Sequence, residues 1–283
     1  MLCNRLTHGS IFTFQETVRS MRLLPNHRAI ISWKVVCAQL GQKKSSIHKT
    51  TLTSVGFVMP SDFPSEAYET MYRLFVKYKD INPTEWQSFG LGWNGLAYRY
   101  RAMAEYAEQY TSSVKTLGNS PPSEERHKQG KALFGFFVSA VSTIECFFYS
   151  TYWVGAILQP GKFPSNSKAL KLYPLDIAQK FKAGFPEDSL SKQMIRCVHE
   201  PTYAEMKEVR DALSHRGMLP RRFYRGGERN GMATMPTNPK DLSNQWQYDL
   251  SIDESTTTTR RHWLSGELKD LTSAANNFCE RKL

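Results

Sequence analysis

Residues 132–158 read ALFGFFVSAVSTIECFFYSTYWVGAIL, an apolar run with one charged residue, Glu145. A run of this length predicts a single long helix, either buried in a protein core or crossing a membrane. Small side chains recur along it at helical spacing and would let another helix approach closely: Ser139, Ser142, Cys146 and Ser150. This stripe and the acid in the middle favour a core helix, because a charge at the centre of a bilayer is costly.

Helical patterns flank this run on both sides. Upstream, apolar residues at helical spacing predict helices over 65–79 and about 96–117, and the helix containing the run is expected to begin at about Ser120. Downstream, helices are expected at about 175–185, 188–199, 201–215 and, as a closing helix, 262–279. A small peripheral β-hairpin is expected at about 245–259, from the alternation of Trp246, Tyr248, Leu250 and Ile252. The sequence therefore predicts a mainly α fold.

The charge balance is strongly basic. The 283 residues include 37 Lys and Arg against 26 Asp and Glu, so the net charge is +11, which favours anionic partners such as nucleic acid or acidic membranes. Residues 1–60 are expected to form a basic N-terminal extension, because the first fifty residues hold eight Lys and Arg but a single acid, Glu16. A transit peptide, a nucleic-acid-binding arm and a loosely ordered extension all fit this composition. The main helical domain is expected over 61–283.

Cysteine and glycine patterns argue against several classes of site. The five cysteines lie far apart without a CxxC pair, so neither a zinc site nor a disulfide framework is expected, and a reducing cytoplasm fits best. Cys197, His199 and Glu200 have no second pair at ligand spacing, and we expect no metal or cofactor. Residues 90–95 match GxGxxG, but a loop-like segment precedes them and Trp93 would crowd a pyrophosphate. This segment is predicted to be a glycine-rich turn between helices.

The segment most suited to chemistry ends the helix expected over 201–215. Its apolar stripe is Met206, Val209 and Leu213, and Arg210 falls at the edge of that stripe. A guanidinium there needs an anionic partner, and Glu145 is the candidate. Asp211 and His215 are four residues apart, so the carboxylate could hold one imidazole tautomer. Helix capping is the alternative interpretation of the segment's end, because His215 and Arg216 precede Gly217.

The motif Arg210-Asp-Ala-Leu-Ser-His215, which follows a long helix carrying an acid, resembles the Arg-x4-6-His signature of the HEPN superfamily. It is similar to the HEPN branch named after the Clostridium thermocellum protein 2314, over residues 120–222. The resemblance implies a bundle of four or five helices that forms a homodimer with the two motifs facing each other. It also implies a metal-independent endoribonuclease that acts on RNA, as in toxin-antitoxin or phage-defence systems, where an antitoxin or other partner protein is expected.

The resemblance implies that Arg210 and His215 are the active pair, and we expect support from Asp211, Ser214 and Glu145. Positions 210 and 215 lie about 140° apart around a continuous helix, so either the helix unwinds near Ser214 or a second subunit completes the site. Basic and aromatic residues suited to phosphate contacts and base stacking follow: Arg216, Arg221, Arg222, Arg225, Phe223 and Tyr224.

Two alternatives stay open beside the ribonuclease. Where HEPN members usually carry a polar residue such as Asn after the arginine, this chain has Asp211, which adds negative charge beside an anionic substrate. The first alternative is therefore a catalytically inactive HEPN-like module that binds RNA or protein. The second is a membrane-anchored protein that uses 132–158 as its span, although the polar interruptions make a membrane partner the less favoured expectation.

Overall fold

The fold is built almost entirely from α helices in the part of the chain that the structure describes. The structure is a computed structural model, and it describes residues 51–53, 56–118, 120–165, 173–215, 221–225, 242–246 and 252–283. For residues 51, 52, 215, 221–225 and 242–246 it describes the backbone alone. The basic extension expected over 1–60 lies outside the described residues, except for 51–53 and 56–60.

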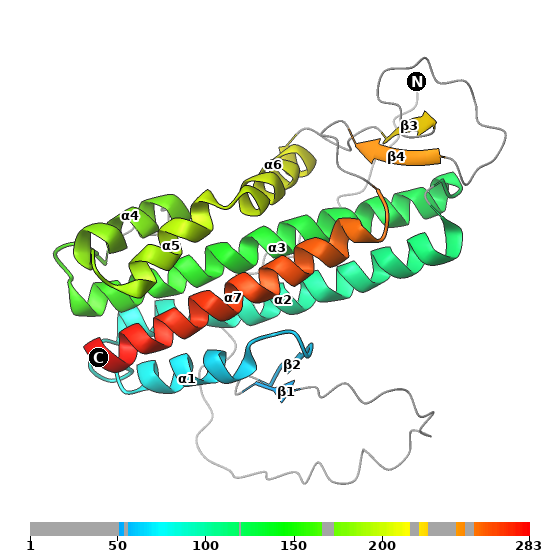
Figure 1. Cartoon of the computed structure of the whole chain (residues 1–283). Helices are drawn as coiled ribbons and strands as arrows, with labels where there is room; N and C mark the ends of the chain where they lie inside the picture. Colours follow the sequence, from blue (N-terminus) through cyan, green and yellow to red (C-terminus); the bar gives the residue numbers. More distant parts are fainter. Residues whose placement is uncertain are drawn as a thin grey trace, which may run out of the picture. The chain divides into compact units, whose positions relative to one another are not determined.

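Seven helices are present in these residues: α1 (Ser65–Val76), α2 (Pro83–Leu117), α3 (Ser123–Leu158), α4 (Pro174–Gly184), α5 (Ser189–His199), α6 (Pro201–His215) and α7 (Ser255–Lys282). Two short antiparallel hairpins pair β1 (Thr51–Leu52) with β2 (Val58–Met59), and β3 (Arg221–Arg225) with β4 (Leu242–Trp246). Residues 48–283 form one compact unit. Figure 1 shows α2, α3 and α7 running side by side, with α1 below them and α4 to α6 above. The prediction of a mainly α fold is confirmed.

The hairpin predicted at 245–259 is wrong in its position. Residues 255–259 form the first turns of α7, and the strand that contains Trp246 pairs with β3 instead. The helix starts early because two hydrogen bonds link Asp253 to the first two residues of α7, Ser255 and Thr256. The Ser255 N–H donates to Asp253 Oδ1 at 2.7 Å, and the Asp253 N–H donates to Thr256 Oγ1 at 3.0 Å. Such a pair satisfies N–H groups that a helix start leaves free, and this outweighs the strand preference of the threonines that follow.

The glycine-rich segment 90–95 is helical, so the prediction of a turn there is wrong. It lies inside α2, where Gly92 faces α3: a Cβ atom at Gly92 would collide with Ser150 Oγ and would lie 2.7 Å from Tyr149 Cδ1. Ser150 Oγ also bonds across to the Phe89 carbonyl at 3.3 Å. The stripe of small residues on α3 therefore does admit a second helix, at Cys146 and Ser150, and Gly92 and Gly95 of α2 are its counterpart.

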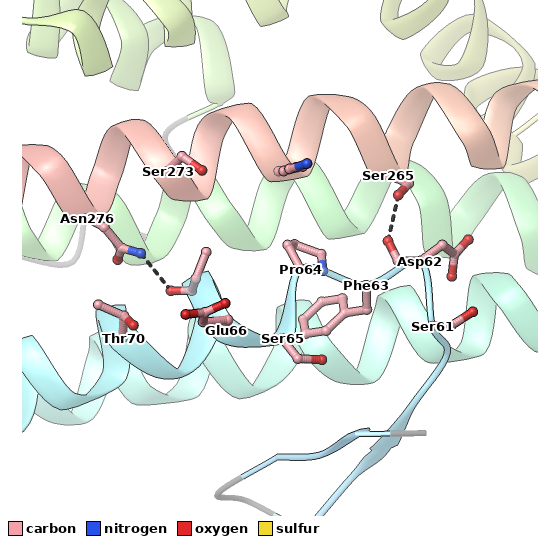
Figure 2. Close-up of a pocket in the computed structure, with 12 residues that line it drawn as sticks. Ser61, Asp62, Phe63, Pro64, Ser65, Glu66, Thr70, Ser265, Ser273 and Asn276 are labelled. Atoms are coloured by element: carbon pink, nitrogen blue, oxygen red, sulfur yellow. Dashed lines mark hydrogen bonds between the residues drawn. The ribbon is translucent and has the colours of Figure 1, made fainter. Parts of the chain in front are cut away.

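The face of α7 toward α1 is held by polar contacts as well as by apolar packing. Arg261 makes a two-pronged contact with Asp62, from Nε at 2.7 Å and from Nη2 at 3.1 Å. Further along, Asn276 Nδ2 donates to the Ala67 carbonyl at 3.0 Å, and Ser265 Oγ donates to the Asp62 carbonyl (Figure 2). These bonds fix the start of α1 against α7 over about four turns of α7.

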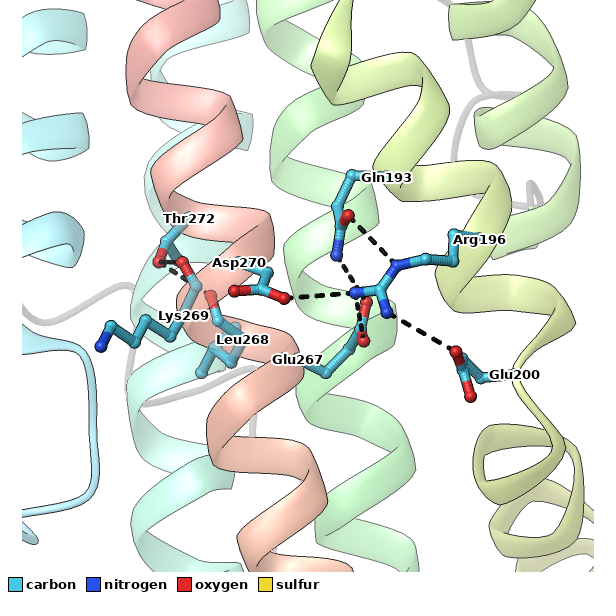
Figure 3. Close-up of polar contacts among 8 residues, drawn as sticks. All are labelled: Gln193, Arg196, Glu200, Glu267, Leu268, Lys269, Asp270 and Thr272. Atoms are coloured by element: carbon cyan, nitrogen blue, oxygen red, sulfur yellow. Dashed lines mark hydrogen bonds and ion pairs between the residues drawn. The ribbon is translucent and has the colours of Figure 1, made fainter.

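A cluster centred on Arg196 joins α5 to α7. Arg196 Nη2 lies 2.9 Å from Glu267 and 3.3 Å from Asp270, and Nη1 lies 3.6 Å from Glu200 (Figure 3). The Glu267 side chain is only 3% exposed, and Gln193 Nε2 donates to it at 3.1 Å. Burial raises the pKa of Glu267, and the nearby positive charge of Arg196 offsets that rise in part.

The raised pKa of Glu267 predicts a pH dependence of stability. The native state holds the Glu267 proton more tightly than the unfolded state, so the free energy of unfolding falls as pH rises from the ordinary glutamate pKa through the raised one. We expect Glu267→Gln to remove this component, so that its unfolding free energy falls less between pH 4 and 7 than that of the wild type. Denaturant titrations across this pH range measure it. Asp270→Asn is the control, because it removes an exposed partner of Arg196 but keeps the buried carboxyl of Glu267. If the free energy of unfolding changed equally with pH in Glu267→Gln and in the wild type, the expectation would be contradicted.

Candidate functional site

The helix α6 presents Arg210 to the long helix α3. Met206, Val209 and Ala212 of α6 are buried and Leu213 is half-buried against the core, which confirms the predicted apolar stripe. Arg210 lies beside this stripe, and its side chain is 18% exposed. The apolar residues thus set the rotation of α6, and that rotation directs the guanidinium toward the middle of α3.

Two carboxylates hold Arg210. Nη2 donates to Glu145 Oε1 at 3.0 Å, which confirms the predicted partner. Nε lies 2.7 Å from Asp211 Oδ1, close enough for strong attraction but without the alignment of a hydrogen bond. Burial lowers the pKa of Arg210, but the two carboxylates more than offset this, so the pKa is raised and the group stays charged. The three side chains together carry a net charge of −1.

The remaining predicted catalytic residues lie at the end of α6. Ser214 is exposed there. Because the helix continues through His215, the proposed unwinding near Ser214 is wrong, and positions 210 and 215 lie about 140° apart around the helix axis. The His215 side chain lies outside the described residues.

The predicted RNA-binding residues lie where the structure describes little. Arg216 is outside the described residues. Strand β3 contains Arg221, Arg222, Phe223, Tyr224 and Arg225, and only its backbone is described.

A cavity of about 410 Å³ adjoins the Arg210 cluster and shares Asp211 with it. Tyr203 lines this cavity from α6, two turns before Arg210. It is buried, and burial followed by the charge of Glu145 raises the pKa of its phenol. The seven-residue spacing between Tyr203 and Arg210 is a signal that sequence reasoning missed, since it places both on one helix face.

Other candidate features carry less chemistry. The cavity of about 690 Å³ between α1 and α7 contains no predicted site residue, and the side chains of Ser265 and Asn276 that line it already bond to backbone carbonyls. Within the described residues no cluster of His, Cys, Asp and Glu suits a metal ion. Cys197 is buried, and burial raises the pKa of its thiol.

One helix among the described residues, α3, is long and apolar enough to cross a membrane. In its most apolar window 67% of the residues are buried within the protein. Hydroxyl groups in this helix bond to its own backbone, as Thr143 does to the Ser139 carbonyl at 2.9 Å and Thr151 to the Phe147 carbonyl at 2.8 Å. The core helix of a protein and a membrane-spanning helix can share this length and composition, so α3 is weak evidence that the protein enters a membrane.

The contact between Arg210 and Glu145 predicts measurable coupling. We expect a double-mutant cycle of Arg210→Met and Glu145→Gln, followed by denaturant unfolding, to give a coupling energy of about 1–2 kcal/mol. The value lies at the low end for a charged hydrogen bond because Glu145 is about one-third exposed. The exposed pair of Arg101 and Glu105 on α2 is the control, for which we expect about 0.3–0.5 kcal/mol. A coupling for the Arg210 pair no larger than this would contradict the geometry.

The described site thus unites Arg210, Asp211 and Glu145 from two helices distant in sequence. Comparisons of the chain with protein-family models, curated proteins and solved structures give no match.

Proposed function

We propose that the protein is a metal-independent endoribonuclease of HEPN type. The observation that carries the proposal is the contact between Arg210 of α6 and Glu145 of α3. This contact brings the arginine of the motif, which lies five residues before His215, to the acid of the long helix. The antiparallel pair of α2 and α3, with α6 and α7 packed on it, supports a HEPN-like bundle of four to five helices.

The proposed reaction needs no metal because RNA supplies its own nucleophile. The 2′-OH loses its proton and its oxygen attacks the adjacent phosphorus, while the bond from phosphorus to the 5′ oxygen breaks and that oxygen gains a proton. The products are a 2′,3′-cyclic phosphate and a 5′-OH. A histidine with a pKa near neutrality suits either proton transfer, and an arginine fork suits the phosphate oxygens.

A homodimer is part of this proposal. Because α6 is helical through His215, positions 210 and 215 diverge by about 140° and do not converge on one phosphate from a single helix. A second subunit would bring its own motif to the opposite side of the substrate. The net charge of +11 supports RNA as the partner, and a toxin-antitoxin or phage-defence role would supply a partner protein.

A second candidate is a catalytically inactive HEPN-like module that binds RNA or protein. The observation in its favour is the neutralisation of Arg210 by both Glu145 and Asp211. A guanidinium held by two carboxylates attracts a phosphate less strongly than an unpaired one.

One experiment separates the two candidates. The purified protein is incubated with single-stranded RNA of mixed sequence in EDTA, and the fragments and their 3′ ends are analysed. Cleavage that leaves 2′,3′-cyclic phosphate supports the ribonuclease. An inert but folded protein that binds the RNA supports the inactive module.

A further inference from the structure

The cavity beside the Arg210 cluster is lined by both apolar and charged side chains. Apolar side chains line it from three helices and the residue that precedes α4: Tyr173, Pro174, Leu175, Val198, Tyr203 and Ala212. Lys207, Glu208 and Asp211 of α6 add charge at the same cavity. A volume of about 410 Å³ lies within the range of small-molecule sites and exceeds what one flat aromatic ring needs.

An exposed aromatic ring stands at this cavity. Tyr173 is 70% exposed, and Leu175 beside it is 42% exposed, so both are among the large apolar side chains that the protein leaves in water. The backbone at Tyr173 is fixed, since its N–H donates to Asp176 Oδ2 at 3.0 Å at the start of α4. An exposed aromatic side chain beside a largely apolar cavity is a feature of surfaces that bind a ligand.

The cavity is continuous with the proposed reaction site. Asp211 lines the cavity and also lies 2.7 Å from Arg210 Nε. A phosphate close to the end of α6 would therefore have its neighbouring nucleotide within reach of the cavity. Lys207, one turn before Asp211 on the same helix and exposed, can contact the chain of phosphates.

We propose that this cavity receives a nucleobase of single-stranded RNA next to the cleaved bond, with the Tyr173 ring stacking on the base. The inference rests on the proposed function and specifies single-stranded RNA as the substrate. Unpaired bases offer a flat apolar face with polar edges, which matches a lining of apolar side chains and carboxylates. In this proposal Glu208 and Asp211 accept hydrogen bonds from exocyclic amino groups. Duplex RNA keeps its bases stacked inside the helix and could not enter the cavity.

The test measures binding separately from cleavage. Fluorescein-labelled single-stranded RNA with 2′-fluoro sugars lacks the nucleophile, so it binds without being cut, and its dissociation constant is read by anisotropy. The variants are Tyr173→Ala, Tyr173→Phe and Ala204→Trp, the last of which fills the cavity from an exposed position on its lining. Tyr98→Ala is the matched control, because Tyr98 is 55% exposed on α2 and does not line the cavity.

We expect Tyr173→Ala and Ala204→Trp to weaken binding by about ten- to a hundredfold. Tyr173→Phe, which keeps the ring, and Tyr98→Ala should stay within about twofold of the wild type. If the wild type binds this RNA and the folded variants Tyr173→Ala and Ala204→Trp, checked by circular dichroism, bind it equally well, the cavity is not the base-binding site. That result would leave the proposed function intact. A wild type that neither binds this RNA nor cuts unmodified RNA would overturn both.

Discussion

If the proposed function holds, we expect His215→Ala to lower the rate of RNA cleavage in EDTA by about 10²–10⁴-fold, the range for removal of a general acid or base. The position ends α6, one turn after Asp211, where a carboxylate can orient an imidazole. The measurement is the initial rate of cleavage of a labelled single-stranded RNA. Because His215 is the last helical residue of α6, its loss should leave the helical circular dichroism signal unchanged.

Variants at Arg210 test the same site through charge. Arg210→Lys keeps the positive charge but loses the planar fork, so we expect most of the activity to disappear even though a contact with Glu145 can persist. Arg101→Lys on α2 is the matched control, since Arg101 also pairs with a glutamate but lies on an exposed surface. Cleavage that survives both His215→Ala and Arg210→Lys would place the active site elsewhere in the chain.

Most of the helices and the central ion pair could be predicted because they depend on local pattern and on one strong electrostatic constraint, whereas the starts of α2 and α7 were missed. Apolar periodicity located α1 and α3 to α6 within a few residues at most boundaries. Arg210 lies at the edge of an apolar stripe, so its guanidinium required an anionic partner. Glu145 is the one acid within the apolar run 132–158. The structure places the two 3.0 Å apart.

The cavity and its exposed aromatic ring could not be predicted in the same way. Tyr173 and Asp211 lie 38 positions apart, and the cavity forms only when the start of α4 packs near α5 and α6. The periodicity of apolar residues within one helix does not predict a contact between separate helices. The spacing of Tyr203, Lys207 and Arg210 along α6 could be read from the sequence, but nothing in the sequence indicated that Tyr173 and Leu175 lie at the same cavity.

The misassigned glycines of α2 show why a local rule fails when a partner helix decides the outcome. Glycine usually weakens a helix, which made residues 90–95 look like a turn. In the structure Gly92 is buried at the contact of α2 with α3, where any side chain would meet Tyr149 and Ser150. The close approach gained by the absent side chain outweighs the loss of helix propensity.

This interpretation makes opposite predictions for two glycines in one helix. Gly92→Ala should lower the free energy of unfolding by about 1–3 kcal/mol, because its Cβ would collide with Ser150 Oγ and the Tyr149 ring. Gly90→Ala should raise it by about 0.5–1 kcal/mol, because no atom lies within 4 Å of a Cβ there and alanine is the better helix former. Denaturant unfolding of the two variants and the wild type measures both values.

The pair is informative because helix propensity contributes equally to both substitutions. Any difference between them therefore reports the packing of α2 on α3 alone. The larger Gly92→Leu should lower stability further, since its side chain must displace the Ser150 hydroxyl from the Phe89 carbonyl as well. If Gly92→Ala and Gly90→Ala stabilised the protein equally, the close approach of α2 to α3 at Gly92 would be contradicted.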